Sequence, residues 1–138
     1  MEYKYADFIK EYVDCDIASC TAKERVAYRW TFNSIDNPKN FIPRYLFPHY
    51  KDSLKEHCVG YALSMFDEQQ QAEDKLNRLC TDKPQLYKKI GTHISSGKLL
   101  QTEGVSSVGA NDEGHFSFFE AKDTDLSSSF VIVKQVYT

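Results

Sequence analysis

Apolar residues at the start of the chain recur with the period of a helix. Tyr5, Phe8, Ile9 and Tyr12 stand at i, i+3, i+4 and i+7, which places them on one face of an amphipathic helix. This pattern predicts a helix within residues 3–13.

A second helix is predicted from about residue 21 to residue 33. Thr21 precedes Glu24 by three residues, the capping-box spacing that satisfies free amide groups at a helix start. Val26, Ala27 and Trp30 would supply the apolar contacts of this helix. We therefore expect the N-terminal part of the chain to be helical.

Residues 34–52 form a connection in which proline recurs every five residues. Pro38, Pro43 and Pro48 each remove a backbone donor and bias the preceding residue away from helix. The segment is also rich in aromatic residues, so it either wraps the domain or binds a ligand. Wrapping is the favoured interpretation. In the alternative, a lid or recognition loop, the polar contributions would come from Arg44, His49 and Tyr50.

The next segments predict one buried strand and two helices. Residues 58–66 are almost continuously apolar, which favours a buried strand, with a short helical turn as the competing interpretation. Asp67 and Gln70 form another capping box, so a helix should run from there to Cys80. A shorter helix should start at Asp82 and end at Gly91.

From residue 92 the apolar pattern becomes that of strands. Residues 92–100, 115–121 and 129–136 are the three candidates, and the polar segment 101–114 is expected to be a loop. The predicted architecture is a single α+β domain over residues 1–138, with N-terminal helices packed on a small, mainly antiparallel C-terminal sheet. The helical part would cover about residues 1–91 and the sheet about residues 92–138.

Composition and charge limit the classes of partner that the chain is expected to bind. A net charge of −3 gives no electrostatic reason to expect duplex nucleic acid. The chain shows neither a signal-peptide pattern nor an apolar run long enough for a membrane span, so we expect a cytoplasmic protein without a membrane partner. We then expect reduced cysteines, and their spacing, without a Cys-x-x-Cys pair, predicts no metal site. We also expect no cofactor.

Two short His-apolar-Ser stretches are the best candidates for chemistry. His93 and Ser95 would share one face of the first predicted strand, and His115 and Ser117 would share one face of the second. If these strands are neighbours, both imidazoles and both hydroxyls converge. Such a pair resembles the His-x-Ser/Thr arrangement of the two-histidine phosphoesterases. The resemblance implies acid–base cleavage of a phosphodiester, with the hydroxyls holding its oxygen atoms.

A second pattern joins Arg44, the run of residues 61–64 that ends at Ser64, and a later acid, either Glu103 or Glu113. This order resembles the site of the ADP-ribosyltransferase-type fold. The resemblance implies that the Arg would hold the phosphates of a dinucleotide, the Ser strand would shape the pocket and the Glu would orient a ribose hydroxyl.

The leading functional hypothesis is a non-catalytic binding or accessory protein that acts through the aromatic-rich loop. Its partner would be a protein or a small ligand, and a homodimer would also account for the sequence. The binding residues under this hypothesis are Arg44, Tyr45, Phe47, His49 and Tyr50. The alternative is a small enzyme that acts on a nucleotide or phosphodiester with His93, His115, Ser95 and Ser117.

Overall fold

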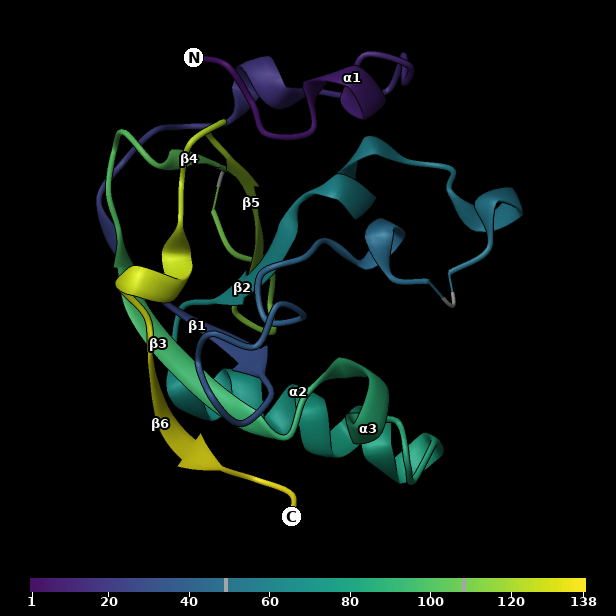
Figure 1. The fold of residues 1–138 in the computed structure, drawn as a ribbon, viewed down its shortest axis with the longest axis vertical. Coiled ribbons are helices and arrows are strands. Elements are labelled where there is room, and N and C mark those ends of the chain that lie inside the picture. Colours follow the sequence, from purple (N-terminus) through teal and green to yellow (C-terminus); the bar gives the residue numbers. More distant parts are fainter. Residues whose placement is uncertain (49, 108) are drawn as a thin grey trace.

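The computed structural model describes residues 1–48, 50–107 and 109–138. Within these residues, six strands form one curled antiparallel sheet, in the order β4-β5-β2-β1-β3-β6 (Figure 1). In chain order the strands are β1 (Arg25–Thr31), β2 (Leu63–Phe66), β3 (His93–Leu99), β4 (Gly104–Ser106), β5 (His115–Glu120) and β6 (Val131–Gln135).

Helices make up a smaller part of the described chain. The three α-helices are α1 (Ala6–Ile9), α2 (Gln69–Asp82) and α3 (Tyr87–Ile90), and α2 and α3 lie at the bottom of the view in Figure 1. No helix among the described residues is long and apolar enough to cross a membrane. Short 3-10 turns complete the structure: η1 (Ile17–Ser19), η2 (Arg44–Leu46), η3 (Asp52–Leu54), η4 (Cys58–Tyr61) and η5 (Leu126–Ser128).

The predicted fold class, helices packed on a small C-terminal sheet, is wrong. The main cause is β1, which occupies the centre of the sheet where a helix was expected. Ala27, Arg29 and Thr31 are buried at alternate positions, whereas Val26 is exposed, so the burial has the period of a strand. β-branched and aromatic residues favour strands, and pairing with β2 and β3 outweighs the capping-box spacing upstream.

Other sequence predictions are closer to the structure. The three strand candidates correspond to β3, β5 and β6, and the helix after Asp67 corresponds to α2. Both interpretations of residues 58–66 hold in part, because η4 forms a helical turn and β2 follows it as a strand. The predicted N-terminal helix shrinks to α1, and the expected loop 101–114 contains β4, which pairs with β5.

The sheet buries apolar residues on both faces. On one face Phe66 and Ile94 form a cluster with Ala72 of α2, and the Trp30 indole donates a hydrogen bond of 2.7 Å to the Ala72 carbonyl. The other face carries the largest cluster, into which residues after β5 fold back. Its buried members are Ala27, Leu63, Met65, Leu99, Phe116, Phe118, Leu126 and Phe130.

A third cluster joins the N-terminal segment to the turn before β2. A disulfide links Cys15 to Cys58, with their Cα atoms 5.4 Å apart and a sequence separation of 43 positions. The expectation of reduced cysteines is therefore wrong for this pair. Two cysteines so far apart in the sequence form no local pattern that would have predicted their bond. Cys20 and Cys80 are free thiols.

Tyr45 lies in this third cluster, against a glycine that cannot carry a side chain. A Cβ atom at Gly60 would stand 2.2 Å from the Tyr45 ring, and Tyr45 is only 2% exposed. We expect Gly60→Ala to lower the free energy of unfolding by about 1–3 kcal/mol, because the ring must shift in a packed environment. Urea denaturation measures this change.

The control for this prediction is the same substitution in a Tyr45→Ala background. There the Gly60→Ala change should be close to neutral, because the ring that it meets is absent. An equal cost in both backgrounds would show that the glycine is required for another reason.

Candidate functional site

The central feature of the site is a split in the sheet between β1 and β2. These strands share a single residue pair, Tyr28 with Phe66, whereas β1 pairs with β3 along its whole length and β2 pairs fully with β5. The two strands therefore diverge on one side of this pair. The backbone groups that a regular ladder would satisfy there need other partners.

Arg29 fills this split. Its Nε donates to the Asn40 carbonyl at 2.8 Å, its Nη1 to the Ser64 carbonyl at 2.8 Å and its Nη2 to the Ile42 carbonyl at 3.5 Å. The residue is 9% exposed. Burial lowers the pKa of Arg29 to about 10, although Glu120 and Tyr5 oppose the shift, so the side chain remains a cation at neutral pH.

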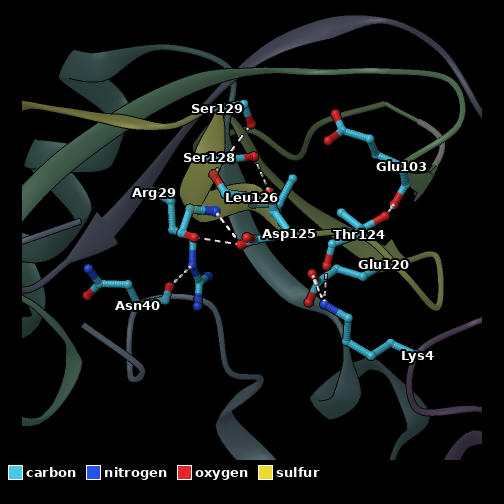
Figure 2. Close-up of polar contacts among 11 residues, drawn as sticks. Lys4, Arg29, Asn40, Glu103, Glu120, Thr124, Asp125, Leu126, Ser128 and Ser129 are labelled. Carbon is cyan, nitrogen blue, oxygen red and sulfur yellow. Dashed lines mark hydrogen bonds and ion pairs between the residues drawn. The ribbon is translucent and has the colours of Figure 1, made fainter. Parts of the chain in front are cut away.

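Asn40 arranges the loop that surrounds the guanidinium. The side chain is buried, with its Oδ1 accepting from the Phe32 amide at 2.7 Å and its Nδ2 donating to the Ser34 and Ile35 carbonyls. These bonds close the loop after β1 and leave the Asn40 carbonyl free to accept from Arg29, as Figure 2 shows.

A buried carboxylate balances the charge of Arg29 without bonding to it. Glu120 Oε2 accepts from Lys4 Nζ at 2.8 Å, and Lys4 also donates to the Thr124 carbonyl (Figure 2). Burial raises the pKa of Glu120, while Lys4 and Arg29 act in the opposite direction. Its Oε1 has no hydrogen-bond partner among the described residues. The pair Lys4–Glu120 thus ties the N-terminal segment to β5.

A cavity of about 310 Å³ opens over the split. Its walls come from β1, β2, β5, α2, α3, the turn η4 and the loop of residues 39–47, which includes η2. Apolar side chains predominate, and no Asp or Glu among the described residues lines it. Nor do three or more His, Cys, Asp or Glu residues of the described chain gather as a metal site. The polar lining residues are Arg29, Lys39, Arg44, Ser64, His115 and Ser117.

His115 lies in this cavity as a neutral imidazole. Its ring packs edge-on against Phe66, with centroids 5.5 Å apart. Burial lowers the pKa of His115, and the positive charges of Lys75 and Arg44 lower it further. Ser117 lines the same cavity, two residues along the strand and on the same face.

The structure does not bring His93 and Ser95 to this cavity. Two strands, β2 and β1, stand between β5 and β3, which amounts to about 14 Å of inter-strand spacing. His93 pairs with Thr31 on the opposite face from His115, and its Nδ1 bonds to the neighbouring Thr92 hydroxyl at 2.7 Å. Ser95 is fully buried against Thr31. The paired-histidine arrangement is therefore not assembled.

The aromatic loop mainly wraps the domain. Tyr45 packs against Tyr50 and Tyr61 at centroid distances of 4.9 and 5.3 Å, and its hydroxyl accepts from a backbone amide. Arg44 is exposed and lines the cavity together with Phe47. His49, the remaining loop candidate, lies outside the described residues.

The trio that resembles the ADP-ribosyltransferase site is only partly assembled. Arg44 and Ser64 both line the cavity. Glu103 instead accepts from the Leu100 amide at 2.8 Å, and Glu113 forms an ion pair with Lys75. Neither acid lines the cavity.

Sequence reasoning missed the two cations Arg29 and Lys39. Arg29 falls within the helix predicted for residues 21–33, but it lies at a buried position of β1. The signal that could have identified Arg29 was an alternation of residues 25–31 between two environments. In a strand with that alternation, an arginine at an inward-facing position must find buried acceptors. Lys39 has no such indication, because it reaches the cavity from an irregular loop.

Comparison with known proteins adds no relative to this description. No family model, no curated protein and no solved structure matches the chain. Any functional inference therefore depends on the residues of the cavity.

Removal of the Arg29 guanidinium should strongly destabilise the fold. We expect Arg29→Met to lower the free energy of unfolding by about 3 kcal/mol or more, because buried carbonyls lose their donors and Glu120 loses a neighbouring cation. Arg78→Met is the matched control, since Arg78 is exposed in its ion pair with Glu113 and should cost less than about 1 kcal/mol. Equal effects in urea denaturation would contradict a structural role for Arg29.

Proposed function

We propose that this chain binds a small anion with an apolar body in the cavity over the β1–β2 split, without chemical conversion. The observation that carries the proposal is the lining of the cavity. Three cations and two hydroxyl residues stand among apolar walls, and no Asp or Glu of the described chain lines the cavity with them. Ligand pockets have this composition, predominantly apolar with a few placed polar groups.

The charges at the mouth of the cavity support an anionic ligand. Lys39 and Arg44 are exposed, and neither forms an ion pair with a carboxylate among the described residues. The chain as a whole carries a net charge of −3, so this local excess of positive charge runs against the overall balance. An anion would gain from both cations, whereas a cation would be repelled.

The apolar walls define the rest of the ligand. The apolar surface of the cavity includes Trp30, Leu79, Leu86, Ile90 and the loop residue Ile42. The volume of about 310 Å³ is at the lower end of the range for small-molecule pockets. The best fit is a small aromatic or aliphatic molecule with one acidic group.

This proposal retains the small-ligand version of the binding hypothesis, but it places the ligand in the cavity rather than on the aromatic loop. Tyr45 is an interior residue and cannot anchor a protein partner without unpacking its cluster. Arg44 and Phe47 contribute through the cavity wall instead. An enzyme with paired histidines is less well supported, because His93 is buried on the other face of the sheet.

The cytoplasmic location expected from the sequence remains a prediction. The Cys15–Cys58 disulfide argues against it, because disulfides persist mainly in oxidising compartments.

Fluorescence titration with anilinonaphthalene sulfonate tests the proposed ligand class, with uncharged phenylnaphthylamine as the matched neutral probe. The sulfonate should bind about tenfold more tightly than the neutral probe. Arg44→Gln and Lys39→Gln should each weaken sulfonate binding by about three- to fivefold, because each removes one partly screened attraction. Lys122→Gln, which changes an exposed lysine outside the cavity, should have no effect. Equal affinities for the two probes would contradict the proposal.

Sulfonate binding should also strengthen as pH falls from about 7.5 to about 5.5. Free His115 is neutral near pH 7 because its pKa is lowered. A bound anion favours the imidazolium, so the complex has the higher pKa and takes up a proton, and affinity rises as pH falls through that value. The sulfonate itself stays ionised throughout.

Two variants separate this effect from other titrations. His115→Gln should remove the pH dependence, whereas His57→Gln, at an exposed site outside this cavity, should retain it. A dependence that persists in His115→Gln would assign the proton to another group.

A further inference from the structure

Two of the four cysteines line a second cavity, and a third is bonded to one of them. This cavity, of about 400 Å³, lies between the N-terminal segment and the turn η4, and both Cys20 and Cys58 line it. Cys58 is already bonded to Cys15, whereas Cys20 is a free, half-buried thiol. A free thiol and one of the two cysteines of the disulfide therefore line the same cavity.

We propose that this cavity is a thiol–disulfide exchange site, at which Cys20 attacks the Cys15–Cys58 disulfide. The Cys20 thiolate would bond to Cys58 Sγ, the Cys15–Cys58 bond would break, and Cys15 would leave as a thiolate that takes up a proton. One S–S bond forms and one breaks, so the step needs neither an oxidant nor a reductant. The product has a Cys20–Cys58 disulfide and a free Cys15.

The same cavity holds a base for the proton of Cys20. His57 Nδ1 is 2.8 Å from Asp14 Oδ2, and both residues line the cavity. If Nδ1 donates to this carboxylate, Nε2 is left as the acceptor. A base is needed here, because burial and the nearby Asp16 raise the pKa of Cys20 and keep it mostly protonated near neutral pH.

The backbone next to Cys20 is held by contacts that do not involve the Cys15–Cys58 disulfide. Thr21 and Ser106 exchange two backbone hydrogen bonds of 2.8 Å, which fix the chain next to Cys20 independently of Cys15. Cys20 and Cys58 are 38 residues apart, against 43 for the existing pair. Loop-closure entropy depends only on the logarithm of this length, so it favours neither disulfide.

Disulfide exchange at this site would also affect the walls of the ligand cavity. Val59 and Ser117 line both cavities, and Val59 directly follows Cys58 in the chain. The N-terminal segment would then be tied through residue 20, and residues 1–15 would keep only their packing and hydrogen bonds. Among those contacts is the stack of Phe8 on Tyr61, at a centroid distance of 5.1 Å.

Thiol trapping in the folded protein tests the proposal. The protein is held at mildly alkaline pH, pulsed with N-ethylmaleimide after increasing times, and mapped by peptide mass spectrometry. Exchange predicts that Cys15 becomes labelled in molecules that contain a Cys20–Cys58 disulfide. Labelling of Cys20 alone, with Cys15 unmodified after many hours, would overturn the proposal.

Two variants distinguish exchange inside the cavity from other routes. Cys20→Ser should leave Cys15 unlabelled at all times, because the attacking thiol is absent. His57→Gln should slow the appearance of labelled Cys15 by about tenfold or more without changing its final level, since a general base affects the rate alone. Labelling of Cys15 in Cys20→Ser at the wild-type rate would also refute the assignment.

Discussion

The guanidinium of Arg29 is the group on which the rest of this structure depends. It occupies the place where β1 and β2 stop pairing, and it bonds to carbonyls from the loop after β1 and from β2. A buried cation without acceptors would be very costly, so these carbonyls must stay in position. Where the sheet opens, Arg29 thus supplies a donor to the Ser64 carbonyl of β2 and holds the loop after β1 beside it.

The cavity follows from this arrangement. Because β1 and β2 diverge, side chains from β5, α2 and the proline-rich loop meet over the gap rather than over a continuous sheet. Glu120 balances the Arg29 charge from within the protein, but it does not line the cavity. Lys39 and Arg44 line the cavity without an ion pair to a carboxylate among the described residues, so their positive charge remains available to a ligand.

The sequence predicted the C-terminal strands and α2, because their periodicity is strong and local. It failed for β1, where Val26, Ala27 and Trp30 fit a helical face as well as a strand, and only pairing with β3 decides between them. Of the candidate site residues, His115, Ser117, Arg44 and Phe47 line the cavity. His93 and Ser95 do not, because strand order is a long-range property that no local motif encodes.

The central claim is that the Arg29 guanidinium is bonded to carbonyls beneath an anion-binding cavity. The NMR resonance of the Arg29 Nε–H group tests this claim most directly. The account predicts a slowly exchanging signal near neutral pH, since this group is buried and donates to the Asn40 carbonyl at 2.8 Å. Titration with anilinonaphthalene sulfonate should shift this signal together with the amides of Ser64, His115 and Ser117. A rapidly exchanging Arg29 signal, or shifts confined to residues outside the cavity, would contradict the account.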